Sequence, residues 1–477
     1  MTALLASLLS LATGPVPGAP SPGASVPLSA PSQSRAAPAL VASAPAAAAT
    51  SPDAVAAAAP ATQLEGMPTA ATLTLAEALA EADRQSPTLE QARARAEEAL
   101  AIVRQAWSPL LPALGATGGF TRNSAEAVFL RPTSPTEVTK VYIQPLEAFA
   151  GGATLRLPLV VPDAWFSLAA SRETARAASA SADAARLTLL AAVVQTAWAA
   201  WAGEEIVAAS VRAVAVAREQ AESSRRQAQA GTATTLSVLQ AETALTRRQS
   251  DLVQALSETA RARLAIGVLL GRPGPVRIPM APLAPPAVLD VAALSREAAE
   301  RRPELAAQAA AVRSYEKQVD AAWWRIAPQL SASGSAFAQT VPYPTGDTSG
   351  WRVTVDLTWP LYDGGYRYGK AHQAEAQVDQ ARAADVQARL QVSQEVQNAA
   401  RDVEVARQRL ALATKQRETA EEAAASARRG FKEGVASSLD VLTANDALFA
   451  AEVLVADSSA RLGGSLAALD RAVGRAP

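Results

Sequence analysis

Every second residue between positions 351 and 359 is apolar, and the residues between them are polar or charged. This period of two predicts a β-strand with one apolar and one polar face. Its length and its terminal tryptophans are typical of a strand that crosses a membrane. A soluble hairpin packed on a helical bundle is the alternative. The candidate lipid-facing residues are Trp351, Val353, Val355, Leu357 and Trp359.

Three further segments are predicted as strands. Residues 149–157 repeat the alternation more weakly, and the small, polar segments 114–120 and 330–337 precede the two alternating strands, with loops between them. Four strands cannot close into a membrane barrel, because the smallest such barrels have about eight. An open edge in lipid would leave backbone groups unpaired. If these strands cross a membrane, the chain must therefore oligomerise.

Two segments, 163–230 and 365–432, lack proline and are predicted as unusually long helices. At 1.5 Å per residue each would extend on the order of 100 Å, which favours coiled-coil packing over a compact enzyme core. The uncharged stretch 187–203 is interpreted as bundle interior, not as a membrane span. Small or apolar residues recur every three or four positions along the second helix, as in a left-handed supercoil: Val386, Leu390, Ser393, Val396, Ala400, Val403, Ala406, Leu410 and Ala413.

The chain aligns with itself as a duplication. Pro87 falls on Pro303 and Trp107 on Trp323 at an offset of 216 residues. Later positions match at 203: Arg225 on Arg428, Gly231 on Gly434, Leu239 on Leu442 and Gly271 on Gly474. Each copy is predicted as helix, strand, loop, strand, long helix, turn and helix. We expect four regions: 1–69, a first repeat 70–271, a proline-rich connection 272–289, and a second repeat 290–477.

The composition disfavours several function classes. With 44 Lys+Arg against 45 Asp+Glu, no basic region indicates a nucleic-acid partner. The absence of cysteine excludes disulfides, thiolate metal sites and a lipidated cysteine. His372 is the only histidine and is interpreted as a helix-surface residue. No phosphate-binding glycine loop or nucleophile constellation occurs. We expect no enzyme activity, catalytic residue, cofactor or metal.

The N-terminal region predicts export. Residues 3–12 form a short apolar run, followed by a segment rich in Ala, Pro and Ser that extends to about residue 69. The first basic residue is Arg35, so the usual positive start of a signal peptide is missing. We interpret 1–69 as a signal peptide plus a disordered linker.

Two motifs resemble the TolC-like outer-membrane efflux family: Leu-Tyr-Asp-Gly-Gly at 361–365 and Gly-Val-Ala-Ser-Ser-Leu-Asp-Val-Leu-Thr-Ala at 434–444. The resemblance implies an α+β membrane protein, a homotrimer whose twelve strands form a barrel in outer-membrane lipid of a Gram-negative bacterium, continued by a periplasmic helical barrel. It also implies a passive exit duct for efflux or type I secretion, coupled to an inner-membrane transporter through a periplasmic adaptor. A soluble periplasmic coiled-coil scaffold is the alternative.

The ends of the long helices are predicted as hairpin tips. Glycines cap the helices, and Thr234 or Thr235 and Ser437 or Ser438 cap the returning helices. Arginines in the closing turns suit the helix dipole, and adaptor docking is their functional alternative. The candidate adaptor-contacting residues are Gly231, Thr232, Gly434, Val435, Arg225 and Arg428.

The resemblance also implies a periplasmic entrance lined by Asp440, which would favour cations. A first-turn aspartate that stabilises its own helix is the structural alternative. A second entrance aspartate of the family falls on Thr443. The tyrosine and arginine that lock the family's closed entrance fall on Phe431 and Ala436, so a closed gate would need other contacts.

Overall fold

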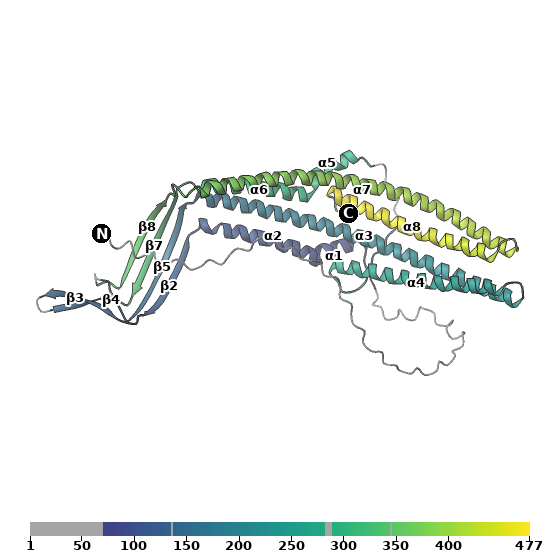
Figure 1. Cartoon of the computed structure of the whole chain (residues 1–477), viewed down its shortest axis with the longest axis horizontal. Helices are drawn as coiled ribbons and strands as arrows, with labels where there is room; N and C mark the ends of the chain where they lie inside the picture. The colour runs from purple at the N-terminus through teal and green to yellow at the C-terminus, as the bar shows by residue number, and fades with distance from the viewer. Residues whose placement is uncertain (1–69, 135–136, 282–288, 344–345) are drawn as a thin grey trace, which may run out of the picture. The chain divides into compact units, whose positions relative to one another are not determined.

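The computed structural model describes residues 70–134, 137–281, 289–343 and 346–477, with the side chains of 131–139 excepted (Figure 1). The expected signal peptide and linker, and residues 282–288 of the connection between the repeats, lie outside these residues. Helices account for most of the described chain. Their bounds are α1 Leu75–Gln85, α2 Pro87–Ala106, the 3-10 turn η3 Ser108–Leu110, α3 Pro162–Gln229, α4 Thr235–Leu270, α5 Val291–Arg301, α6 Pro303–Trp324, α7 Tyr366–Lys432 and α8 Ser438–Val473.

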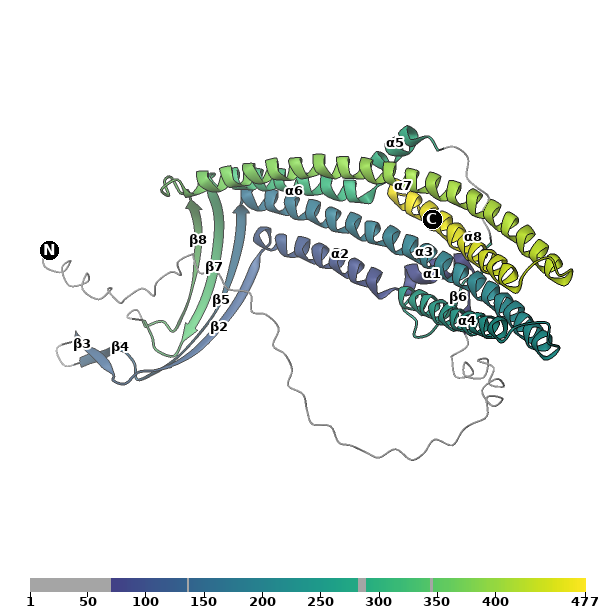
Figure 2. The ribbon, with the colours of Figure 1, turned by 45° about the vertical axis from the view of Figure 1, so that its right-hand side comes forward.

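The two long helices confirm the prediction to within one residue at each end. α3 and α7 have 68 and 67 residues, and each is continuous because no proline interrupts it. The shorter helices lie beside them: α2 and α4 contact α3, whereas α6 and α8 contact both α3 and α7 (Figure 2). The helices therefore follow the order α2, α3, α6, α7 near the sheet and α4, α3, α8, α7 toward the tips.

The strands form one antiparallel sheet in the order β2-β5-β7-β8. These strands are β2 Ala113–Arg122, β5 Glu147–Val160, β7 Gln329–Gln339 and β8 Ser349–Thr358. Since β2 follows α2, β5 leads into α3, β7 follows α6 and β8 leads into α7, sheet and helices share one order. Apart from the sheet, β1 Ala71–Thr72 pairs in parallel with β6 Val276–Arg277.

The register of the four strands gives the sheet two chemically distinct faces. Val355 of β8 lies opposite Ala332, which lies opposite Leu157 of β5. In the same way Leu114 of β2 lies opposite Leu155. The other face carries the serines and glutamines of β7, the polar residues of β8, and few large apolar side chains. One face thus suits lipid and the other water, as the alternation in β8 predicted.

The expected loop between the first two strands contains a hairpin that sequence reasoning missed. β3 Ala127–Ser134 pairs with β4 Glu137–Gln144 in an antiparallel ladder. Val128, Phe129 and Leu130 are consecutive and exposed on it. Such a run has no period of two, so the strand signal on which the other predictions depended was absent.

Within the described residues each repeat has a buried cluster of its own, and a further cluster, Val194 and Trp198 of α3 with Ala467 of α8, joins the two repeats. One cluster joins α1, α3, α4 and β6, and includes Val193, Ala197 and Ile266. The other joins α5, α7 and α8, and includes Val396 and Val403. α3 is apolar enough over part of its length to suit a membrane crossing by length and composition alone. Its contacts with α1, α2, α4, α6 and α8 confirm the interior interpretation of 187–203.

The predicted seam of α7 is only partly buried. From Val396 to Ala413 its members pack against the core, but Val386 and Leu390 are 58% and 67% exposed. Near the sheet α7 packs on α6 and toward the tip on α8, and the described chain leaves these two residues largely exposed, so their place in a coiled-coil seam stays a prediction.

Candidate functional site

The two helical hairpins, α3–α4 and α7–α8, end in turns with the same backbone geometry. Gly231 and Gly434 have φ of 75° and 76°, the left-handed region that side chains disfavour. Thr234 accepts a hydrogen bond from the N–H of Ser237 at 3.2 Å. The predicted glycine turns and helix caps are therefore confirmed.

Asp440 takes part in the cap of α8. The Ser437 hydroxyl accepts from the N–H of Asp440 at 3.2 Å, while Oδ2 of Asp440 accepts from the Ser437 hydroxyl at 2.7 Å and from its N–H at 2.8 Å. This reciprocal capping box satisfies two donors at the helix start. Hydrogen bonds from the Ser437 side chain and then its backbone lower the pKa of Asp440. The carboxylate is exposed, so it holds its own helix and still faces solvent.

Equivalent arginines close both hairpins with different partners. Arg225 on α3 binds Glu242 on α4, with Nε and Nη2 at 2.8 Å and 2.7 Å from Oε1. Arg428 on α7 binds Asn445 on α8, with the same nitrogens at 3.3 Å and 3.0 Å from Oδ1. Glu242 and Asn445 are equivalent in the duplication, so an ion pair in one hairpin is replaced in the other by hydrogen bonds from the arginine to a neutral amide.

A second arginine joins the two hairpins to each other. Arg248 on α4 is buried, binds Asp251 at 2.9 Å on its own helix, and forms an ion pair with Asp446 on α8. Its guanidinium lies 4.4 Å from the ring centre of Phe449. Sequence reasoning missed this group. The duplication aligns Arg248 with Ala451, which is buried, and this alignment was the available signal for a buried arginine.

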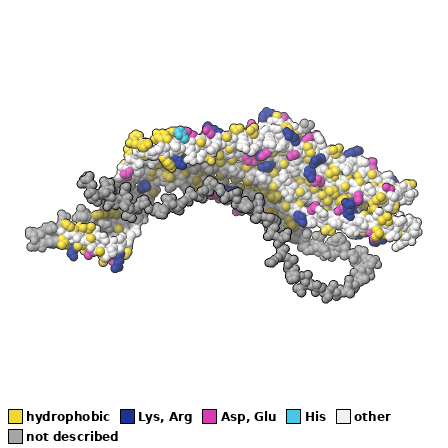
Figure 3. All heavy atoms as spheres, viewed as in Figure 1, with side chains coloured by type: hydrophobic (Ala, Val, Ile, Leu, Met, Phe, Trp, Pro, Cys, Tyr) yellow, Lys and Arg dark blue, Asp and Glu magenta, His cyan; other side chains and the backbone are white. Residues whose placement is uncertain are grey.

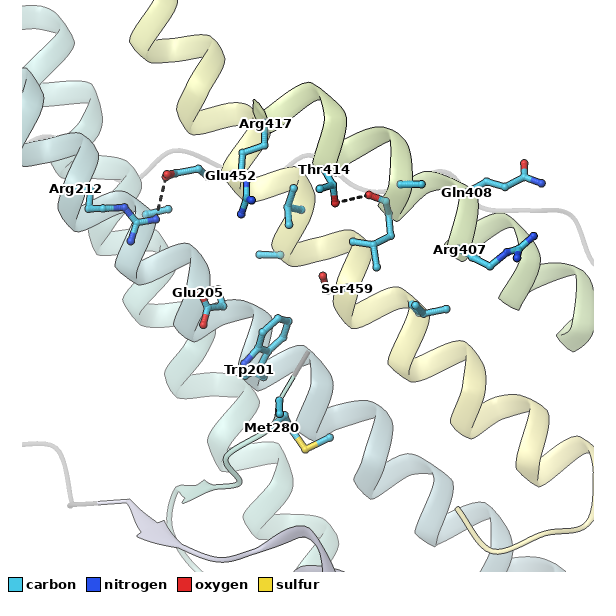
Figure 4. A pocket seen from close by; sticks show the side chains of 17 residues that line it. Trp201, Glu205, Arg212, Met280, Arg407, Gln408, Thr414, Arg417, Glu452 and Ser459 are labelled. Atoms are coloured by element: carbon cyan, nitrogen blue, oxygen red, sulfur yellow. Dashed lines mark hydrogen bonds and ion pairs between the residues drawn. The ribbon is translucent and has the colours of Figure 1, made fainter. Parts of the chain in front are cut away.

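Two further polar contacts connect the hairpins. Gln220 donates to the Ser438 hydroxyl at 3.1 Å, and Arg212 pairs with Glu452 at 3.1 Å. Arg212 and Glu452 line both a cavity of 350 Å³ toward the tips and a groove of 1040 Å³ on the other side. Figure 4 shows this groove: Arg212 reaches Glu452 across it, with Trp201 and Met280 at its lower end.

The remaining candidate residues lie in or beside the two hairpin turns. Val435 is 80% exposed between Gly434 and the start of α8. Thr232 donates to the Gln227 carbonyl at 3.0 Å, and Thr443 donates to the Leu439 carbonyl at 2.8 Å. Phe431 is half-buried. These contacts explain the turns; they leave the proposed adaptor and entrance roles as predictions.

The five residues proposed to face lipid are 58% to 78% exposed; four of them alternate along β8 and so share one face, and Trp359 follows the strand. His372 lies on the surface of α7, 2.9 Å from a carboxylate oxygen of Glu375. Among the described residues, no group of three or more metal-binding side chains is brought together.

A sheet with one apolar face, continued by helices much longer than a bilayer is thick, defines the class: a membrane protein with a large part outside the bilayer. The chain belongs to the outer membrane efflux protein family, which it matches over residues 78–272 and 294–475. It is accordingly an outer-membrane protein of a Gram-negative bacterium.

Solved structures share the fold. The outer membrane protein VceC of Vibrio cholerae is 20% identical, with a TM-score of 0.70 over 84% of this chain and 96% of that one. The Campylobacter jejuni CmeC outer membrane channel is 18% identical, with a TM-score of 0.71 over 84% and 85%. Protein CyaE of Bordetella pertussis is 29% identical over 225 residues, 46% of this chain and 48% of that one. The chain thus matches about half the length of that relative.

Proposed function

We propose that three copies of this chain form a passive exit duct, with a twelve-stranded barrel in the outer membrane and a helical tunnel in the periplasm. The observation that carries the proposal is the four-stranded sheet, which has an apolar face and two open edges, β2 and β8. In hydrocarbon each open edge must be paired. Pairing β8 of one copy with β2 of the next closes the sheet and satisfies both edges.

The helical layer supports the same assembly. Its two flanks, α7 on one side and α2 with α4 on the other, carry large apolar residues that this chain leaves exposed. Leu390 and Leu412 of α7 are 67% and 71% exposed, and Val268 of α4 is 73% exposed. Burial of such side chains stabilises by about 1.5–3 kcal/mol each. A neighbouring copy would cover both flanks at once.

The duct would couple to an inner-membrane transporter through a periplasmic adaptor that contacts the tips, in efflux or type I secretion. The exposed tip residues Thr232 and Val435, and the arginines Arg225 and Arg428, support this placement. Asp440 and Thr443 would line the entrance, with Phe431 beside them. The contacts between hairpins, above all Arg248 with Asp446, would hold the entrance in place of the family's tyrosine and arginine.

Lysine substitution on each face of β8 tests the proposal against a soluble scaffold. Val355→Lys places a charge on the apolar face, which costs about 2–4 kcal/mol at the membrane midplane and should abolish insertion. Thr354→Lys, on the polar face, is the matched control and should insert. Detergent-solubilised wild type should have the mass of a trimer and conduct ions in planar bilayers. A monomer that is stable without detergent, with both variants equally tolerated, would contradict the duct.

A further inference from the structure

An aromatic pair is repeated where each half of the sheet meets the helices. In the first copy Trp107, at the end of α2, packs edge-on against Trp165 of α3, with ring centres 6.2 Å apart and planes at 76°. In the second copy Trp323 of α6 packs against Tyr368 of α7 at 6.1 Å and 76°. The duplication sets Trp107 on Trp323 and Trp165 on Tyr368.

The aromatic pairs are incompletely covered by the chain. Trp165 and Tyr368 are 56% and 54% exposed, although Trp and Tyr are usually largely buried. Figure 3 shows hydrophobic side chains gathered at the end of the helices that adjoins the sheet. Aromatic residues make up only 4% of the chain, so their repetition at this level needs an explanation.

Tyr368 lies on a broad face of the helical layer and not on a flank. Near the sheet, α7 packs on α6 through residues that share one flank, including Ala371, Ala374 and Val378. At about 100° per residue, Tyr368 and Glu375 project roughly a quarter turn beyond that flank. α6 therefore reaches them only through the Trp323 ring, and a copy beside α7 would leave them uncovered.

The handedness of the chain identifies this face. The Gln339 N–H donates to the Thr348 carbonyl, so even-numbered residues of β8 direct their backbone groups toward β7. Consider the apolar face of the sheet viewed from the front, with β8 and α7 running downward. For L-residues, β7 and α6 then lie to the right of β8 and α7. A right-handed helix running downward turns from its right flank toward the viewer. Tyr368 and Glu375 thus lie on the same side as Trp351.

The neighbours of the two pairs differ in charge. Arg172 lies over the Trp107 ring, 5.4 Å from its centre, and is not in an ion pair with any described residue. Its equivalent in the second copy is Glu375, which accepts hydrogen bonds from the Trp323 indole at 3.1 Å and contacts His372. The first pair therefore adjoins an available cation, and the second adjoins a carboxylate.

We propose that both aromatic pairs contact the phospholipid headgroups of the inner leaflet, and that only the first, through Arg172, binds a lipid phosphate. Amphipathic Trp and Tyr rings suit the headgroup layer, and a guanidinium suits phosphate. The pairs lie on the lipid side, just beyond the membrane-spanning strands. Since the chain has no cysteine, lipidation cannot supply this contact. The inference rests on the outer-membrane placement of the chain.

Absence of cysteine also makes single-cysteine labelling direct. Fluorophores at Ala169→Cys and His372→Cys, equivalent positions one turn beyond Trp165 and Tyr368, should be quenched by headgroup-spin-labelled phospholipid in vesicles. Labels at Ser167→Cys and Lys370→Cys, equivalent positions on the opposite broad face, should be quenched by aqueous iodide instead. A label at Val355→Cys, quenched by acyl-chain-brominated lipid, verifies insertion.

Headgroup charge then separates the two pairs. Spin-labelled phosphatidylglycerol in place of phosphatidylethanolamine should strengthen quenching at position 169 but not at 372. Arg172→Gln should lower that preference about fivefold, the order expected for one cation at an anionic surface. Arg176→Gln, whose side chain already pairs with Glu173, is the control.

Three outcomes would overturn the inference while Val355→Cys still reports insertion: iodide reaches 169 and 372 as readily as 167 and 370; neither quencher reaches them, so a second copy covers them; or the lipid preference is equal at 169 and 372. Failure of the Val355→Cys label to meet lipid would instead contradict the duct itself.

Discussion

The α3–α4 and α7–α8 hairpins have nearly the same backbone and different charges. Both turn through a left-handed glycine, both begin the returning helix with a hydroxyl cap, and both close with an arginine. The first carries Glu242 where the second has Asn445, and the second carries Asp440 where the first has Ser237. Both copies keep the glycine, the hydroxyl cap and the arginine, which the turn needs. The charges beside them differ between the copies, so the turn does not depend on these.

Valine at either tip glycine should have the largest effect. A β-branched residue at positive φ costs about 2 kcal/mol. Gly231→Val and Gly434→Val should therefore speed hydrogen exchange at the tip amides and weaken adaptor binding, with the trimer intact. Gly369→Ala, in α7 with open space around it, is the control and should be neutral or stabilising. Loss of trimer as severe as loss of adaptor binding would contradict a local role.

The caps should differ by a smaller amount. Ser437→Ala and Thr234→Ala should each destabilise the returning helix by about 1 kcal/mol. The second hairpin should lose more, because Ser437→Ala removes both the bond from the Asp440 N–H and the bond that the Ser437 hydroxyl donates to Oδ2 of Asp440, whereas Thr234→Ala removes the bond from the Ser237 N–H. Hydrogen-exchange rates of the amides in each returning helix measure the two losses. Equal losses would show that the reciprocal bond adds nothing.

The Asp440 part of that cap should depend on pH. Because its folded pKa is lowered, its contribution is present above the ordinary carboxyl pKa and is lost as pH falls through the lowered value. Protection of the amides at the start of α8, which is exchange corrected for its intrinsic pH dependence, should fall in that acidic range in wild type. In Asp440→Asn this protection should be independent of pH there, and a parallel fall in the variant would assign the effect to another group.

Exchanging the arginine partners should have the smallest effect on stability. Glu242→Gln removes an ion pair and Asn445→Glu creates one, and such surface pairs contribute under about 1 kcal/mol. In the double variant we expect the stability of the first hairpin tip to become less dependent on salt, and the stability of the second to become more dependent on it. Unchanged salt sensitivity would mean that these arginines serve geometry alone.

Asp440→Asn also tests the proposed function of the tip as a channel entrance. If Asp440 lines the entrance three times around the axis, the substitution should lower cation preference in single-channel recordings. The reversal potential in a salt gradient measures this directly. A value equal to wild type would leave Asp440 as a helix-start residue only.

The sequence specified local features better than contacts between distant segments. α7 was predicted closely because it starts after Gly365 and continues without proline to its glycine turn. β8 was predicted because one of its faces is apolar throughout. Arg248 and Asp446 were missed because their contact depends on how two hairpins pack, which no short pattern reports. The pairing of Trp107 with Trp165 depends likewise on two elements far apart in sequence.

The open edges of the sheet have a consequence for how the protein is made. A lone chain entering the bilayer would carry the unpaired backbone of β2 and β8 into hydrocarbon, so insertion and association cannot be separate steps. In the proposed trimer, both are completed together only when three chains meet. The yield of channel should therefore rise more steeply than the amount of chain synthesised, and slowly produced chains should wait in the periplasm, where the same edges invite aggregation.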